Sequence, residues 1–537
     1  MPHCVSYDML RTITTLLFCL ATFGNLTGQT SDYTLQNSAS DQILPAVLPV
    51  SGMSDIANLD DKEMDLALPD AISMALEFNL DLQIQRFNPL LDGFRLQDAL
   101  AGWIPSLRGD LTSRDDSNPG GINPATNEPF PSNETETTII RPSIEGLLPT
   151  GTSYTVGFDT TERTGEFIPV DRQHTGNVSF WMRQPLLKNL WIDDTRRFMR
   201  VSRKNLEISY AQLEFTMMQI LRNVEHAYYD LIASRENLKV QEKALELGLQ
   251  TLRENRKRVE VGVMAPLDET DAEAQVATSR ADLIRARQEL RSRQNALKRL
   301  ITNDFARFYE IELIPTESLE TGEFDFDVYA SWSHGLVKRP ELVEARINID
   351  RQDIVIKYQK NQLFPQIDLI ASYSVNGVDS RYSDLWDDFR RRDDPSTSIG
   401  IRFDIPLHNQ ALRNRYKVAK AEKELLIVQL QNLEQQIQSQ IAEAVDLARS
   451  AKEQVLASSE ARRFAEKALE VEQVKLANGK STSFIVLRLQ RDLTQRRADE
   501  ISAMANYRKS MTTLSFNEGT ILERNGVLID ATEFDRP

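Results

Sequence analysis

Apolar and polar residues alternate along several short segments, as in strands that present two different faces. The clearest case is the segment 397–406. Its apolar face holds Ile399, Ile401, Phe403 and Ile405, and its polar face holds Gly400, Arg402 and Asp404. The segment 365–375 alternates less cleanly, and together they predict a pair of strands before Pro406.

An earlier part of the chain repeats this scheme. Its apolar positions include Leu107, Leu111, Val178, Phe180 and Met182, and its polar positions include Arg108, Asp110, Thr112, Ser179 and Arg183. One face suits lipid and the other suits water, as in the wall of a transmembrane barrel. A soluble sheet with one buried face shows the same alternation, so the pattern alone leaves both interpretations open.

Two very long segments have helical periodicity and contain no proline. Residues 191–261 and 407–478 would each extend roughly 105 Å as unbroken helices. In the second, apolar residues recur about every 3.6 positions, which favours nearly straight or right-handed packing over a left-handed coiled coil. That series is Leu426, Leu430, Leu433, Ile437, Ile441, Ala444, Ala448, Ala451 and Val455.

These elements occur twice in the same order, so an internal repeat organises the chain. Each copy is predicted to contain a helix, a β region, a long helix that stops at a glycine, and a return helix. The first copy, 66–303, has these elements at 66–103, 104–186, 187–262 and 266–303, and the second, 339–516, has them at 339–364, 365–406, 407–478 and 482–516. A mixed segment, 304–338, links the copies, and a tail, 517–537, follows them.

Two segments do not follow the repeat. Residues 137–163 form an extra hairpin-like stretch, which could extend the wall or form an external lid. Residues 376–396 carry many charges together with Trp386 and Phe389, and their composition favours a solvated loop.

The N-terminus indicates export. Residues 13–23 are an apolar run after Arg11, which predicts a signal peptide at 1–28, followed by a polar linker at 29–65. Both cysteines of the chain, Cys4 and Cys19, lie in the predicted signal, so the mature protein would contain no thiol. Phe18 before Cys19 is a poor match to a lipid-attachment site, and we expect no acyl anchor there.

Composition narrows the class of protein. The 537 residues carry 63 basic and 79 acidic side chains, a formal charge of −16, which argues against nucleic-acid binding. The mean hydropathy of −0.40 argues against a polytopic helical membrane protein. The five histidines are isolated, and no nucleotide-binding or nucleophile motif is present. We therefore expect no enzyme, no cofactor and no metal site.

Short motifs at the junctions of the repeat resemble those of the TolC-like outer-membrane efflux protein family. The resemblance covers about residues 66–516, and the ordered set is more specific than any one motif. In the first copy these are Ala71-Ile72, Gly102-Trp103-Ile104-Pro105, Gln184-Pro185-Leu186 and the turn Arg258–Asp268. In the second they are Arg339-Pro340-Glu341-Leu342, Leu363-Phe364-Pro365, Ile405-Pro406-Leu407 and the turn Leu476–Thr482.

The resemblance implies a mainly α protein with β-strands. Each chain would give four strands to one shared transmembrane β-barrel and long periplasmic helices to one shared α-helical tunnel, in a homotrimer. Such a protein is a passive exit duct of a tripartite efflux pump or type I secretion system. Its partners would be a periplasmic adaptor protein, an inner-membrane pump and outer-membrane lipid.

The resemblance also assigns site residues at the two turns, which would form the periplasmic gate and dock the adaptor. They are Gly262, Val263, Pro266, Asp268, Gly479, Lys480, Ser481, Thr482, Ile485 and Arg488. Family members carry paired aspartates where this chain has Ile485 and Arg488, so we expect an apolar or weakly basic constriction here. Asp268 could equally be a solvated carboxylate at a helix start.

The polar strand positions complete the expected site. The residues that would face the lumen of the barrel are Arg108, Asp110, Arg183, Arg402 and Asp404. Because these charges have both signs, the sequence does not indicate which ions the lumen would favour. The competing hypothesis is a periplasmic coiled-coil scaffold in which the β segments form soluble sheets. The exported substrate is not indicated by any residue.

Overall fold

The computed structural model describes residues 63–527 apart from 123, 131, 166–171, 320, 321, 323–325 and 393. The chain divides into two units, Met1–Ala46 and Val47–Pro537, and every described residue lies in the second. The predicted signal peptide, nearly all of the predicted linker and residues 528–537 of the predicted tail lie outside the described residues.

The helix predicted at 66–103 is in fact two helices, α2 (Leu68–Phe78) and α3 (Leu80–Ala101). The break is at Asn79, whose backbone is extended and whose side chain accepts a hydrogen bond from the Leu82 N–H at 3.1 Å. The Asn79 amide also donates to the Leu300 carbonyl at 2.9 Å. Asn79 therefore caps α3 and fixes the junction against a distant helix.

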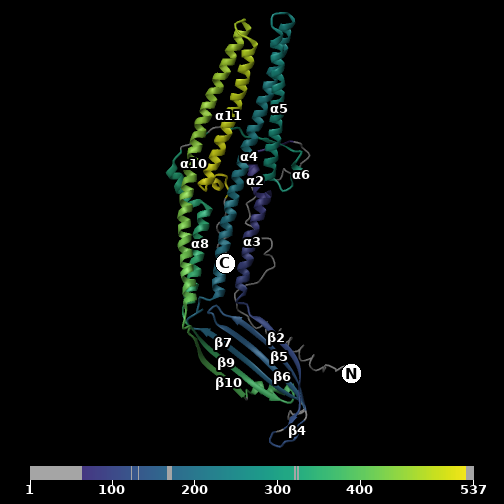
Figure 1. Cartoon of the computed structure of the whole chain (residues 1–537), viewed down its shortest axis with the longest axis vertical. Helices are drawn as coiled ribbons and strands as arrows, with labels where there is room; N and C mark the ends of the chain where they lie inside the picture. The colour runs from purple at the N-terminus through teal and green to yellow at the C-terminus, as the bar shows by residue number, and fades with distance from the viewer. Residues whose placement is uncertain are drawn as a thin grey trace, which may run out of the picture. The chain divides into compact units, whose positions relative to one another are not determined.

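Four helices dominate the second unit (Figure 1). The two long ones, α4 (Asp194–Glu260) and α10 (Gln410–Ala477), have 67 and 68 residues. Each turns back into a shorter partner, α5 (Pro266–Ile301) or α11 (Ser483–Asn517). The helix α4 begins seven residues later than predicted because the preceding segment forms a turn with left-handed backbone at Asn189 and Trp191.

Shorter elements pack around the middle of these helices, and one of them, Pro340–Asn361, continues from there to the end of α4 next to the sheet. They are β1 (Glu63–Leu66), α6 (Phe305–Phe308), β8 (Glu312–Pro315), α7 (Val328–Lys338), α8 (Pro340–Asn361) and α12 (Ile521–Arg524). The strands β1 and β8 pair in parallel. The largest apolar core lies here and includes Leu66, Leu221, Tyr228, Leu297 and Leu313, all fully buried. None of the helices in the described ranges is long and apolar enough to span a bilayer.

Six antiparallel strands form one sheet, in the order β10-β9-β7-β6-β5-β2. Their bounds are β2 (Ser106–Asn118), β5 (Asn133–Leu147), β6 (Ser153–Gly165), β7 (Gln173–Pro185), β9 (Gln366–Asp379) and β10 (Asp394–Asp404), and a separate small pair consists of β3 (Gly121–Ile122) and β4 (Pro129–Phe130). The two repeats supply the four expected strands β2, β7, β9 and β10. The hairpin expected at 137–163 adds two more as β5 and β6, so it extends the sheet and is not an external lid. Strands from both copies of the repeat meet where β7 pairs with β9.

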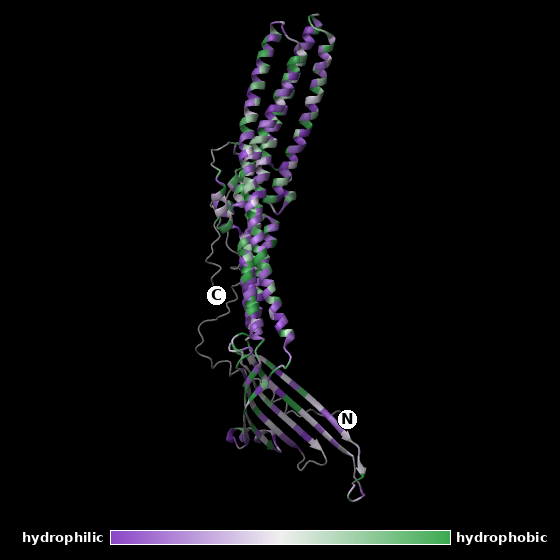
Figure 2. Cartoon of the chain, turned by 60° about the vertical axis from the view of Figure 1, so that its left-hand side comes forward, coloured by the Kyte–Doolittle hydropathy of each residue, from purple (hydrophilic) through white to green (hydrophobic). Residues whose placement is uncertain are grey.

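The register confirms that the sheet has one apolar and one polar face. Paired residues of neighbouring strands lie on the same face, and alternate residues along a strand share it. The apolar face carries exposed Leu107, Leu111, Val156, Phe180, Tyr373, Ile399, Ile401 and Phe403. Figure 2 shows the resulting bands of apolar and polar residues along the strands.

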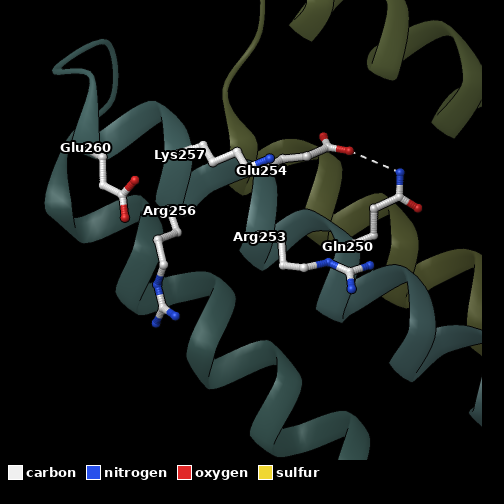
Figure 3. Close-up of a pocket in the computed structure, with 6 residues that line it drawn as sticks. All are labelled: Gln250, Arg253, Glu254, Arg256, Lys257 and Glu260. Carbon is white, nitrogen blue, oxygen red and sulfur yellow. Dashed lines mark hydrogen bonds between the residues drawn. The ribbon is translucent and has the colours of Figure 1, made fainter.

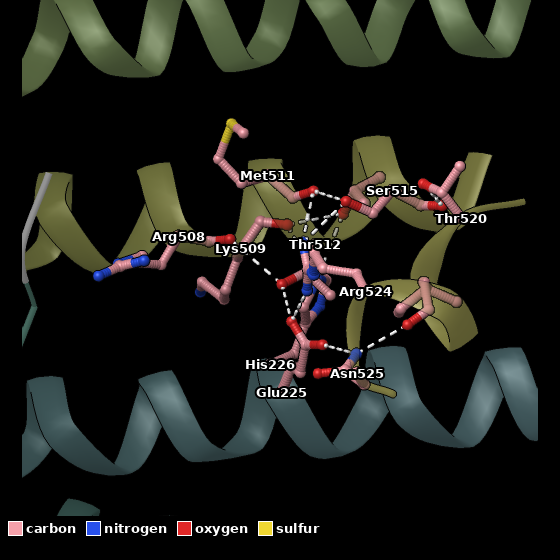
Figure 4. Close-up of polar contacts among 12 residues, drawn as sticks. Glu225, His226, Arg508, Lys509, Met511, Thr512, Ser515, Thr520, Arg524 and Asn525 are labelled. Atoms are coloured by element: carbon pink, nitrogen blue, oxygen red, sulfur yellow. Dashed lines mark hydrogen bonds and ion pairs between the residues drawn. The ribbon is translucent and has the colours of Figure 1, made fainter. Parts of the chain in front are cut away.

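A buried carboxylate of α4 fastens α12 and the end of α11 to that helix. Glu225 of α4 is fully buried and accepts hydrogen bonds from Thr512 of α11 and from Asn525 after α12, the latter at 2.8 Å. It also pairs with Arg524 of α12 (Figure 4). Every oxygen of this carboxylate has a partner, so its burial is compensated.

We expect Glu225→Ala to lower the free energy of unfolding by about 2–3 kcal/mol, because it leaves Thr512 and Asn525 without their buried acceptor and Arg524, 38% exposed, without its ion pair. Thermal unfolding followed by circular dichroism measures this. Glu523→Ala is the matched control, since Glu523 makes only a solvent-accessible pair with Lys338 and should cost about 1 kcal/mol or less. Equal losses in the two variants would contradict this assignment.

Candidate functional site

The two helical turns have the same hydrogen-bonding geometry. After α4, the Gly262 N–H donates to the Val259 carbonyl and the Val263 N–H donates to the Arg258 carbonyl, both at 3.0 Å. The Gly262 φ of 75° is left-handed. This is a Schellman motif, which ends a helix and reverses the chain without leaving its last carbonyls unpaired.

The second turn repeats this arrangement after α10. The Gly479 N–H donates to Leu476 at 3.1 Å, the Lys480 N–H donates to Lys475 at 2.8 Å, and the Gly479 φ is 70°. Pro266 begins α5 after the first turn, and Thr482 is the N-cap residue of α11 after the second. The glycines predicted from sequence therefore form the turns of two equivalent helical tips (Figure 1).

A buried polar bridge joins the two tips. Asn255 of α4 is 2% exposed, and its amide donates to the Ser483 hydroxyl of α11 at 2.7 Å and to the Asp268 carbonyl of α5 at 3.2 Å. Ser483 is also buried. One side chain thus contacts the return helices of both tips. Neither residue was singled out from the sequence, where Asn255 lies in an ordinary polar stretch of α4 and Ser483 is distant from it along the chain.

Ion pairs reinforce the first tip on its solvent side. Arg256 of α4 pairs with Glu269 at 2.9 Å and with Glu273 at 3.0 Å, both on α5. Hydrogen bonding to Glu269 is the main cause that raises the pKa of Arg256. The pairs are exposed, so they orient the two helices more than they stabilise them.

A charged surface depression lies beside these pairs (Figure 3). All of its lining residues belong to α4: Gln250, Arg253, Glu254, Arg256, Lys257 and Glu260. Its one drawn hydrogen bond runs from Gln250 to Glu254 at 3.0 Å along the helix. Acidic, basic and amide groups of one helix face do not form a nucleophile with a base, so this depression offers no catalytic constellation.

The second tip contains an oriented carboxylate. Glu472 of α10 accepts a hydrogen bond from the Ser481 hydroxyl and pairs with Lys475 at 2.9 Å. The Ser481 bond is the largest cause that lowers the pKa of Glu472, followed by Lys475, with a smaller effect of Arg488. This assigns a contact to the predicted site residue Ser481, whereas Glu472 was missed because nothing in its sequence context distinguishes it.

The remaining predicted tip residues surround the two turns. Val263, Lys480, Thr482 and Arg488 are exposed, and Asp268 and Ile485 are half-buried. The Asp268 N–H donates to Ala265 within the first turn of α5, a favourable place for a carboxylate. Apolar side chains at both tips are also exposed: Val261, Val263, Leu267, Val474 and Phe484.

The five polar strand residues predicted for a lumen all lie on the polar face of the sheet. Arg108 pairs with Glu145 across β2 and β5 at 3.3 Å, and Arg183 pairs with the fully buried Asp368 at 2.7 Å. Asp110, Arg402 and Asp404 share this face by register. Opposite charges on neighbouring strands thus neutralise much of this surface locally. Within the described ranges, no group of three or more metal-ligating side chains could hold an ion.

Comparison with known proteins decides the family. Residues 184–303 and 333–519 match the model described as outer membrane efflux protein. The chain belongs to this family. This efflux protein is therefore an outer-membrane channel protein, and its family is a transport family and not a family of enzymes. No curated protein matches the sequence.

Solved structures share the fold at low sequence identity. The outer-membrane channel OprN is 14% identical, with a TM-score of 0.62 over 86% of this chain and 91% of that one. The CmeC channel of Campylobacter jejuni is 15% identical, with a TM-score of 0.63 over 95% and 99%. The protein VceC of Vibrio cholerae is 17% identical, with a TM-score of 0.62 over 84% and 96%.

Replacement of either turn glycine should destabilise its tip. We expect Gly262→Ala and Gly479→Ala each to cost about 1–2 kcal/mol, because their backbone is left-handed. A Cβ would meet nothing within 4 Å at either position, so crowding adds no cost. Gly93→Ala in α3 is the control: it also has open space and should be neutral or stabilising by up to about 1 kcal/mol. Denaturant unfolding measures all three, and equal effects would refute the backbone argument.

The second tip should respond to acid through Glu472. Its pKa lies below the ordinary value of 4.5, so its contribution to stability is present above that value and is lost as pH falls through the folded pKa. We expect Ser481→Ala to raise the pKa of Glu472 by removing the largest stabilising hydrogen bond. Infrared difference spectra against Glu472→Gln report the carboxylate titration. An unchanged midpoint in Ser481→Ala would contradict this cause.

Proposed function

We propose that this efflux protein assembles as a homotrimer and is the passive exit duct of a tripartite efflux pump or type I secretion system. Three sheets close into one transmembrane β-barrel, and the long helices form one periplasmic tunnel. The tips dock a periplasmic adaptor, which connects the duct to an inner-membrane pump. Arg108, Asp110, Arg183, Arg402 and Asp404 line the lumen of the barrel.

The observation that carries this proposal is a sheet with an exposed apolar face and two open edges. The residues of β10 are exposed throughout, and β2 forms the other edge. Open edges cannot be solvated in lipid, because every backbone N–H and C=O needs a partner there. Pairing of β10 with β2 of the next copy satisfies both edges. With six strands per chain, a trimer would form a barrel of about eighteen strands, a size that leaves an aqueous channel.

The tips supply the gate and the docking surface. The exposed apolar side chains Val261, Val263 and Leu267 offer contact area to an adaptor. The bridge from Asn255 to Ser483 and Asp268 holds the return helices of both tips against α4, which favours a closed mouth. Opening requires this bridge to break. Because Asn255 and Ser483 are buried, breaking their hydrogen bonds costs free energy until water reaches these polar groups.

We expect Asn255→Ala to increase the single-channel conductance or the open fraction of time in a planar bilayer, because it removes both bridging hydrogen bonds at once. Ser483→Ala removes one of them and should have a smaller effect in the same direction. Gln250→Ala is the control, since its hydrogen bond stays within α4 and joins no tips.

Two outcomes contradict the proposal. If the purified protein forms no conducting pores in any variant, the duct itself is refuted. If wild type conducts and Asn255→Ala conducts identically, the bridge is not part of the gate and the duct remains.

A further inference from the structure

The charged segment between β9 and β10 was expected to be a solvated loop, and this expectation was wrong. It contains the helix α9 (Tyr382–Arg391), which packs on the apolar face of the sheet. Trp386 stacks on Phe158 of β6 with ring centroids 5.3 Å apart, and Phe389 meets the same ring edge-on at 6.0 Å. Leu385 is 1% exposed.

Two glycines of the sheet form the surface on which this helix packs. A Cβ on Gly176 of β7 would lie 2.6 Å from the Phe389 ring, and one on Gly377 of β9 would lie 3.3 Å from Leu385. Gly176 and Gly377 are direct cross-strand partners, and their face also holds Phe158 and Val178. The two glycines therefore let α9 pack closely on the apolar face, as glycines in strands do where another segment approaches.

The position of α9 along the strands coincides with the end of the exposed apolar band. On β9 this band runs from Ile367, next to the helices, to Val375, which is 7% exposed where α9 begins to cover the sheet. A transmembrane strand needs about 9–11 residues, and this stretch has that length. Aromatic rings gather at the boundary, as they do at a membrane surface: Phe158, Tyr373, Trp386 and Phe389.

The side of α9 that faces away from the sheet is charged. The helix ends in Arg390, Arg391 and Arg392, and the side chains of Arg390 and Arg391 are 83% and 63% exposed. Arg390 lies 3.8 Å from Asp387, a loose pair between exposed groups. Arg391 pairs with Asp388 at 2.9 Å. Such surface pairs are weak, so a phosphate group can compete for these guanidinium groups.

We propose that α9 is an interfacial helix that binds the phosphate groups of outer-leaflet lipid headgroups through Arg390, Arg391 and Arg392. Its apolar side fixes it to the outer wall of the barrel, and its basic end lies at headgroup level. This inference rests on the proposed function, because the apolar face meets lipid only in a membrane-inserted barrel. The inference assigns phosphate-bearing lipids as ligands to α9, a helix that has no role in the proposed transport function.

The first test measures lipid affinity directly. Native mass spectrometry of the detergent-extracted protein, titrated with bisphosphorylated lipid A, compares wild type with the triple variant R390Q/R391Q/R392Q. We expect affinity to fall on the order of a hundredfold, given roughly fivefold for each of the three arginines near an anionic membrane surface. Dephosphorylated lipid A should bind wild type and variant equally.

The control variant is R280Q/R285Q/R291Q, which removes the same charge from exposed positions of α5 and should keep the wild-type affinity. If the α9 variant binds bisphosphorylated lipid A as tightly as wild type does, the proposal is overturned. A fall of equal size in the control would show a general charge effect and would overturn it as well.

A second test locates the helix. In vesicles of brominated phosphatidylcholine, Trp386→Phe should remove a tryptophan component that is quenched at headgroup depth. If the protein inserts and conducts but this component is not quenched, α9 lies away from the membrane surface, so this inference fails while the proposed function stands. If the protein does not enter bilayers at all, both fail.

Discussion

The structure depends on the alternation of side chains between the two faces of the six-stranded sheet. Neighbouring strands pair in a register that keeps the apolar residues on one face and the charged ones on the other. A slip by one residue on any strand would reverse its faces. The exposed apolar face needs an apolar medium, and the unpaired edges β2 and β10 need further strands. Membrane location and assembly therefore follow from the same constraint.

The helices meet a different demand, because the proposed duct must remain stiff along their length and open at their ends. The largest apolar core and the buried Glu225 network lie around the middle of α4. At the tips the apolar clusters are smaller, such as that of Leu469 and Val486, and buried polar contacts such as the Asn255 bridge contribute about 1 kcal/mol each. Because of this distribution, local opening costs less free energy at the tips than in the middle of the helices.

Local patterns were enough to predict the parts of the molecule that local physics controls. The long proline-free segments became α4 and α10, and both turn glycines have left-handed backbone. The placement of β5 and β6 could not be predicted, because their strand partners are set by hydrogen bonds to distant segments. The break at Asn79 depends on its contact with Leu300. Likewise, Asn255 and Ser483 form a site only after α4 and α11 pack together.

The segment that became α9 shows why composition can mislead. Its many charges favoured a solvated loop, yet Tyr382, Leu385, Trp386 and Phe389 are spaced as one face of a helix. That spacing was readable in the sequence, but the surface it covers was not, since Gly176 and Gly377 come from two different strands. The sequence therefore showed the apolar side chains of α9 but not the glycine surface on which they pack.

If the proposed function is right, this chain forms its channel only as a trimer in the outer membrane. The most direct measurement is the mass of the protein extracted from outer-membrane fractions in mild detergent, determined by light scattering with the bound detergent subtracted. We expect three copies per particle. A monomer or dimer that is soluble without detergent would contradict it.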